Sequence, residues 1–221
     1  KIKMAENLFE TRYDLTKKSK LKELYESNKI LIYSLLFVLI VIFSSYTYYK
    51  IIKEKKKIQL SENYIQAKIY INNEKEKEAI ETLKNIIFSN DPTYSTLSFF
   101  MLLNGNLITD TDEISKLFDH LLENNKFDKE IRNLLLYKKA LYKSNFSDES
   151  KLLIETKELL EDSIDSVWRA HTILLLGDFY FSKKEYTKAK NFYSQILLIK
   201  NLEPELYDLA KSKLVFIKDA E

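Results

Sequence analysis

The hydrophobic pattern of this chain changes once, from an unbroken apolar stretch near the N-terminus to apolar positions that recur every three or four residues. The stretch Ile30–Tyr49 contains no charged residue and lies between Lys29 and Lys50. Twelve of its positions are Leu, Ile, Val or Phe. A helix of about 20 such residues covers a hydrocarbon core about 30 Å thick. Each of these twelve side chains contributes about −0.3 to −0.6 kcal/mol to the free energy of membrane insertion, and together they favour insertion by about 4 to 7 kcal/mol. The stretch is therefore predicted to form a transmembrane helix.

Two other interpretations of this stretch fit less well. A buried core helix is usually shorter and carries a polar stripe. A cleaved signal peptide has a shorter apolar run that ends in small residues. Ser44 and Ser45 are small, but Tyr46, Tyr48 and Tyr49 follow almost at once, and aromatic rings of this kind favour the headgroup level. The stretch Ile30–Tyr49 is therefore predicted to anchor the chain in lipid.

From Ile58 onward the apolar residues recur at helical spacing, in segments of about 12 to 17 residues. Eight polar breaks separate the segments: Asn72–Asn73, Asn90–Pro92, Asn104–Asp112, Asn124–Asp128, Ser144–Asp148, Asp162–Asp165, Ser182–Glu185 and Asn201–Pro204. The pattern predicts about nine helices in antiparallel pairs, with N-caps at Asp112, Asp128, Asp148 and Asp165. Two glycines and two prolines in 221 residues also favour helices over sheets.

The predicted organisation has four parts: an N-terminal flank (1–29), the transmembrane helix (30–49), a basic linker (50–57) and a helical repeat domain (58–221). We expect Met4 to be the biological start. The flank is either a short amphipathic helix or a loosely ordered tail, and the sequence leaves both open. Lysines and arginines beside the span are equally numerous on its two sides, so charge alone does not orient it.

Charge separates the anchor from the rest of the chain. Residues 1–57 hold 13 Lys/Arg and 6 Asp/Glu, a net charge of +7, whereas residues 58–221 hold 22 and 27, a net charge of −5. The soluble part lacks the basic stripe and interleaved aromatics of nucleic-acid binders, so no nucleic-acid partner is expected. The chain has no cysteine, which excludes disulfides and thiol catalysis and leaves the redox compartment open.

The last third of the chain has the spacing of a tetratricopeptide repeat, in which small residues stand where two helices cross closely. If Ala170 is the first position of the repeat, the characteristic small and bulky positions of the repeat are occupied by Leu176, Gly177, Tyr180, Ala189 and Tyr193. A weaker copy counted from Leu60 uses Ala67, Tyr70, Ala79, Leu83 and Ile86. The two middle pairs keep the helix lengths but lose the small residues, and Pro204–Ile217 has the pattern of a terminal cap. The predicted fold is all-α: one transmembrane helix, then a tetratricopeptide-like α-solenoid of about four helix pairs plus a capping helix.

This architecture resembles the YfgM-like proteins, the tetratricopeptide-like ancillary subunits of the SecYEG translocon, particularly their alphaproteobacterial versions. The likeness is strongest at Trp168-Arg169-Ala170 and Leu176-Gly177-Asp178, within Ser166–Leu197, and is topological elsewhere. The resemblance implies a bacterial inner-membrane protein with a cytoplasmic N-terminus and periplasmic repeats. It also implies that the translocon and periplasmic chaperones are its partners.

No pattern in the sequence points to catalysis, to a metal or to a cofactor. His120 and His171 are the only histidines and form no metal-binding pair, and the two glycines, Gly105 and Gly177, are too far apart for a phosphate loop. We therefore expect no enzyme activity and no small-molecule substrate.

Stacked helix pairs bind other proteins along the face that their first helices share. On that face we expect Tyr64, Lys68 and Ile71 from the first pair, and His171, Leu174, Asp178 and Phe181 from the last. Several of these residues have packing between pairs as the alternative role, and His171 is more simply a half-buried histidine. A second functional hypothesis keeps the anchor but places the repeats in the cytosol, where they recruit chaperones or targeting factors.

Overall fold

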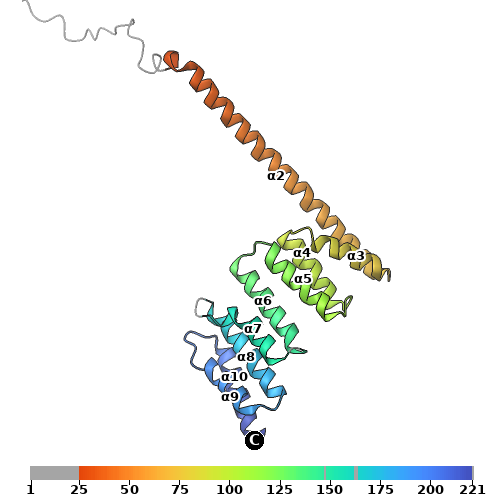
Figure 1. The fold of residues 1–221 in the computed structure, drawn as a ribbon, viewed down its shortest axis with the longest axis vertical. Coiled ribbons are helices and arrows are strands. Elements are labelled where there is room, and N and C mark those ends of the chain that lie inside the picture. Colours follow the sequence, from red (N-terminus) through yellow and green to blue (C-terminus); the bar gives the residue numbers. More distant parts are fainter. Residues whose placement is uncertain (1–24, 147, 162–163, 221) are drawn as a thin grey trace, which may run out of the picture. The chain divides into compact units, whose positions relative to one another are not determined.

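The structure is a computed structural model that describes residues 25–146, 148–161 and 164–220, and in these ranges the chain is helical with short connections (Figure 1). The helices are α2 (Lys29–Asn72), α3 (Glu76–Ile87), α4 (Pro92–Asn104), α5 (Thr111–Asn124), α6 (Lys129–Ser144), α7 (Glu149–Thr156), the 3-10 helix η1 (Glu158–Leu160), α8 (Ser166–Ser182), α9 (Tyr186–Ile196) and α10 (Pro204–Ala220). The prediction of an all-helical chain is confirmed for these residues. All eight predicted breaks coincide with the ends of helices.

The chain divides into two units, Lys1–Ile58 and Gln59–Glu221. In the first unit, α2 contains the apolar stretch, and the side chains of that stretch are exposed except for Ile32 and Thr47, which are half-buried. Among the described residues, α2 is the one helix long and apolar enough to cross a membrane. It also continues through residues 50–57, for which we predicted a linker, because lysine and isoleucine are tolerated in helices and no glycine or proline interrupts them. The amphipathic helix considered for the N-terminal flank falls mainly on residues 1–24, outside the described ranges.

The second unit has two hydrophobic cores rather than one. The first core is built from the end of α2 through α5, and the second from α7 through α10. Helix α6 belongs to both, because Leu135 is buried in the first core and Ala140 in the second. α6 is therefore the element that joins the two halves of the helical unit.

Aspartate side chains cap α4, α5, α6, α7 and α8, although not always at the predicted residue, whereas α3 and α9 begin without a side-chain cap. Asp128, Asp148 and Asp165 are confirmed as N-caps. The prediction for Asp112 is wrong, because the cap of α5 is Asp110, whose Oδ1 accepts hydrogen bonds from the amides of Asp112 (2.8 Å) and Glu113 (3.1 Å). Asp112 instead lies in the first turn, where its charge favours the positive end of the helix dipole.

Helix α7 has 8 residues and is shorter than the predicted segments of about 12 to 17. The hydroxyl of Thr156 donates to the carbonyl oxygens of Leu152 (3.0 Å) and Leu153 (3.2 Å). Such a bond competes for carbonyls in the last turn of a helix. The chain then tightens into η1, which buries Leu159.

The first and last helix pairs turn in the same way, at one constant offset along the chain. After α2, Glu74 has φ 59° and the amide of Lys75 donates to the carbonyl of Tyr70 at 2.9 Å. After α8, Lys184 has φ 63° and the amide of Glu185 donates to the carbonyl of Tyr180 at 2.9 Å. Both are helix ends of the Schellman type, with a left-handed residue followed by a six-to-one hydrogen bond. The two weakly similar sequence segments therefore share a local structure.

The small and bulky positions of these two pairs are buried, apart from Tyr70, which is half-buried; they are Ala67, Ala79, Leu176, Gly177, Tyr180, Ala189 and Tyr193. At the closest crossing of the last pair, a Cβ on Gly177 would lie 2.4 Å from Cε1 of Tyr193. In the first pair the equivalent residues are Ala67 and Leu83, both fully buried in the first core. A larger side chain on one helix is thus matched by a smaller one on the other.

The size relation between Gly177 and Tyr193 can be tested by measuring the free energy of unfolding. Gly177→Ala is expected to lower the free energy of unfolding by about 1–3 kcal/mol, because the added methyl overlaps the Tyr193 ring. In a Tyr193→Leu background the same substitution should be neutral or stabilising, since it recreates the Ala67–Leu83 combination and alanine favours helix by about 1 kcal/mol over glycine. Urea denaturation of the four proteins measures this coupling. An equal cost in both backgrounds would contradict the overlap.

Candidate functional site

The binding residues predicted in the first helix pair lie at the end of α2. Lys68 is exposed, and with Ile71 it lines a cavity of about 330 Å³ between α2 and the end of α4. Tyr64 is half-buried, with its ring centroid 6.2 Å from that of Tyr94. Burial raises the pKa of the Tyr64 hydroxyl. Two of the three side chains are thus accessible from one cavity.

The binding residues predicted in the last pair are engaged in packing. The His171 ring lies 5.7 Å from the Tyr137 ring of α6, and Leu174 and Phe181 pack against the second core. Asp178 accepts hydrogen bonds from the hydroxyl of Tyr193 (2.6 Å) and from Nζ of Lys213 (2.7 Å). These contacts hold α8 against α6, α9 and α10.

Trp168 makes a further contact between pairs at the start of α8. Its Nε1 donates a hydrogen bond to Oε2 of Glu130 at 2.9 Å, and its ring lies 6.0 Å from that of Tyr137. Both partners are on α6. The first helix of the last pair is therefore joined to the first helix of the pair before it.

No equivalent contact connects the first helices of the two preceding pairs, α4 and α6. α6 packs against α8 and α8 against α10, but α4 and α6 do not pack closely on each other. Instead, two cavities of about 340 and 520 Å³ lie between them. Residues of α4 and α6 line both cavities, and the connection Lys126–Asp128 before α6 completes the first one. The two cavities therefore form the two ends of one α4–α6 groove.

Each wall of the groove is one continuous stripe on its helix. On α4 the stripe is Thr93, Thr96, Leu97, Phe100, Leu103 and Asn104, and on α6 it is Ile131, Leu134, Lys138, Leu141 and Tyr142, continued by the C-cap residue Asn145. Residues three and four apart lie on one face of a helix. One cavity is lined by the N-terminal ends of both helices and the other by residues further along both. The two helices therefore run in the same direction, with the groove between them.

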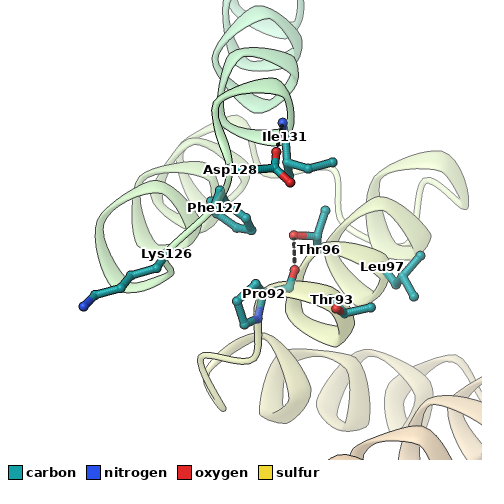
Figure 2. A pocket seen from close by; sticks show the side chains of 8 residues that line it. All are labelled: Pro92, Thr93, Thr96, Leu97, Lys126, Phe127, Asp128 and Ile131. Atoms are coloured by element: carbon teal, nitrogen blue, oxygen red, sulfur yellow. Dashed lines mark hydrogen bonds between the residues drawn. The ribbon is translucent and has the colours of Figure 1, made fainter.

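The groove is mainly apolar, with polar groups at its edges. Figure 2 shows the end near Pro92, where Phe127 is directed towards Thr96 and Lys126 extends away. Oδ1 of Asp128 accepts a hydrogen bond from the amide of Ile131 at 2.9 Å and so is occupied as an N-cap. Lys126 and Lys138 are exposed and form no ion pair within the described ranges. The residues lining the groove therefore include two lysines and one carboxylate, a small excess of positive charge.

An ion cluster holds α6 from the side away from the groove. Nζ of Lys139 lies 2.6 Å from a carboxylate oxygen of Asp119 on α5 and 2.6 Å from one of Glu155 on α7, and Lys143 also pairs with Glu155. Burial opposes the charge on Glu155, but hydrogen bonds from Lys139 and Lys143 outweigh it and lower its pKa. Burial likewise opposes the charge on Lys139, but its bonds to Asp119 and Glu155 raise its pKa. The cluster ties α6 to α5 and α7.

The α4–α6 groove was not predicted from the sequence, because the repeat prediction rested on small residues at helix crossings and the two middle pairs lack them. A signal was present in α4, PTYSTLSFFMLLN, which is apolar on more than one face. Its buried face carries Ser95, Ser98, Phe99 and Leu102. The side chains Leu97, Phe100 and Leu103 form a second apolar face, and a helix that is apolar on two faces needs two partners.

The described residues contain no group of three or more His, Cys, Asp or Glu side chains placed to hold a metal ion. His120 lies outside the groove, with Nε2 2.9 Å from Oδ1 of Asn90 and its ring 4.7 Å from the Phe88 ring. These contacts join α3 to α5.

Comparison with known proteins brings no relative: no family model, no curated protein and no solved structure matches this chain.

The ion cluster behind the groove predicts a dependence of stability on pH. The lowered pKa of Glu155 means that its contribution is present above its unfolded-state value near 4.5 and is lost as the pH falls through the folded-state value. Glu155→Gln is therefore expected to cost about 2 kcal/mol near neutral pH and less at acid pH. Urea denaturation of wild type and variant between about pH 3 and pH 7 measures the difference. Glu123→Gln is the control, because Glu123 is exposed on α5 and pairs with no basic residue in the part of the chain that the structure describes. A cost that does not change with pH would contradict the role of the charge.

Proposed function

We propose that this chain is a single-pass membrane-anchored adaptor whose tetratricopeptide-like helical unit binds a segment of another protein in the α4–α6 groove. The observation that carries the proposal is the groove itself. Two helices of one fold present apolar stripes to each other without packing together, and the side chains Leu97 (44 % exposed), Ile131 (38 %) and Leu141 (36 %) remain accessible. Exposed apolar surfaces of this kind mark interaction sites.

The anchor is supported by the exposed surface of α2. The side chains from Ile30 to Phe43 are almost all exposed, although most are Leu, Ile, Val or Phe. Such a continuous apolar surface is unfavourable in water and favourable in a bilayer, because burying each apolar side chain in hydrocarbon releases its hydration cost. Membrane lipid is thus the proposed partner of Ile30–Tyr49.

The groove suits an amphipathic helix of a partner protein. α4 has 13 residues, so its stripe is about 20 Å long, enough to contact three to four turns of a helix laid along it. Amphipathic helices bind such grooves with apolar residues spaced three and four apart. Lys126 and Lys138 at the edge favour acidic residues beside that apolar stripe in the partner, since complementary charge selects and orients it.

The narrower proposal concerns the partners and the side of the membrane. The resemblance to the YfgM-like proteins supports an inner-membrane protein with its helical unit in the periplasm and with the SecYEG-type translocon and periplasmic chaperones as partners. A large C-terminal domain is translocated whatever the charge of its flank, so the equal lysine counts are compatible with this orientation. The second candidate has the same anchor with the helical unit in the cytosol, where the basic edge of the groove would receive acidic segments of chaperones or targeting factors.

Site-specific photocrosslinking in cells tests the groove. A photoreactive residue at Leu97 or at Leu141, on opposite walls, is expected to capture the same protein, because one bound segment contacts both walls. Ile154 (73 % exposed) on α7 and Leu198 (80 % exposed) after α9 are matched apolar positions outside the groove and should not capture it. Lys138→Glu should weaken capture at both groove positions by about tenfold, equivalent to about 1.4 kcal/mol.

Capture of a protein from Ile154 or Leu198 but not from the groove would contradict the assignment of the site. If the captured protein is a membrane-embedded secretion component, the narrower proposal is supported. If it is a cytosolic factor, the second candidate replaces it.

A fusion of alkaline phosphatase after Glu221 tests the anchor and its orientation. The fusion is expected to remain in the membrane after alkaline carbonate extraction, because the twelve apolar side chains favour insertion by about 4 to 7 kcal/mol. It should also be active, since the enzyme matures outside the cytoplasm. An inactive fusion that stays in the membrane would favour the cytosolic candidate, and a fusion released by carbonate would contradict the anchor.

A further inference from the structure

The first two turns of α2 beyond its apolar stretch carry a dense positive charge. Residues 50–57, KIIKEKKK, contain five lysines and one glutamate. We predicted a linker here, but the segment is helical and all of its residues are exposed. The lysines are therefore held at fixed heights and directions on a helix instead of on a loop.

Helical spacing places an aromatic and three of these lysines on one face. Tyr46, Lys50, Lys53 and Lys57 follow each other at intervals of four, three and four residues, which in a helix makes a single stripe. At about 1.5 Å per residue, Lys50 and Lys53 lie within about 6 Å of Tyr49 along the helix axis, and Lys57 within about 12 Å. The tyrosine belongs at the boundary of the hydrocarbon and the lysines in and just above the headgroup layer.

Among the described residues, no acidic side chain pairs with the lysines of this stripe. Lys50, Lys53 and Lys57 form no ion pair within the described ranges, and Glu54 is the one acidic residue in this segment. A lysine at headgroup depth is close enough to a lipid phosphate for direct pairing, and one slightly further out is still within a Debye length of about 8 to 10 Å. A polybasic segment at this depth gains about 1 kcal/mol per lysine from an anionic surface.

We propose that the stripe Tyr46–Lys50–Lys53–Lys57 binds the phosphate headgroup of an anionic glycerophospholipid in the leaflet that it faces. The tyrosine hydroxyl lies at the level of the glycerol and the lysine ammonium groups contact the phosphate. The inference rests on the proposed anchor, but it does not depend on which way the chain crosses the membrane. The competing interpretation is a solvated flank that only ends the span, which has no preference among lipids.

The test uses the full chain reconstituted in phosphatidylcholine vesicles that contain either spin-labelled phosphatidylglycerol or spin-labelled phosphatidylcholine. The motionally restricted fraction of each label gives the relative association constant of the two lipids. We expect phosphatidylglycerol to be preferred about fivefold, equivalent to about 1 kcal/mol. K50Q/K53Q/K57Q should reduce the preference to less than about twofold, and K50R/K53R/K57R should retain it, because arginine keeps the charge.

The control variant K77Q/K116Q/K190Q removes the same charge from exposed lysines of the helical unit that pair with no described acidic residue, and it should behave as wild type. Raising the salt from about 0.1 M to about 1 M should weaken the preference in the wild type, because the Debye length falls from about 10 to about 3 Å. Inorganic phosphate at matched ionic strength should have no further effect, which separates a lipid headgroup from a free anion.

Three results would overturn the proposal: equal association of both lipids with the wild type, an unchanged preference in K50Q/K53Q/K57Q, or loss of the preference to inorganic phosphate at matched ionic strength. All three leave the anchor intact. If the chain does not float with vesicles of either composition, the anchor of the proposed function fails as well.

Discussion

The position of α6 between two hydrophobic cores is the constraint on which the helical unit depends. Leu135 belongs to one core and Ala140 to the other, and Lys139 between them is held by carboxylates of α5 and α7. A further face of α6 meets α8 through Tyr137, Trp168 and Glu130. A helix has a limited circumference, and among the described residues these contacts leave no helix packed closely on the stripe of Ile131, Leu134, Lys138 and Leu141. The groove between α6 and α4 therefore exists because the other faces of α6 are already packed against α5, α7 and α8.

The joints between helices show how similar packing is reached with different residues. In the last pair Gly177 admits the ring of Tyr193, and in the first pair Ala67 faces the smaller Leu83. Protein interiors are close-packed, so the two side chains at a helix crossing must together fill a similar volume even where each residue differs. The ring of Tyr193 also brings a hydroxyl, which bonds to Asp178 and so links α9, α8 and, through Lys213, α10. That hydroxyl is held protonated, because burial and the adjacent Asp178 raise the pKa of Tyr193.

The two units of the chain fit two different solvents. In the first, the apolar stretch of α2 is exposed over its whole circumference, as lipid allows, and lysines follow it directly. In the second, apolar side chains are gathered into cores and the net charge is negative. The sorting is incomplete along the α4–α6 groove, where Leu97, Ile131 and Leu141 remain partly accessible, and at separate positions outside it such as Ile154 and Leu198. The groove differs from these separate positions because its apolar side chains face one another from two helices, and the proposed binding function rests on that arrangement.

The sequence by itself determined the local features: the apolar helix, the eight breaks between helices, three of the four predicted aspartate caps, and the constant offset between the first and last pairs. These are short-range properties, set by periodicity, capping and helix-ending residues. It did not determine that α7 would end after 8 residues, that the last-pair residues His171 and Asp178 would be engaged by α6, α9 and α10, or that α4 and α6 would stay apart. Only the tertiary structure decided these, because whether an apolar stripe becomes core or surface depends on which other helix reaches it, and that partner is distant in the sequence.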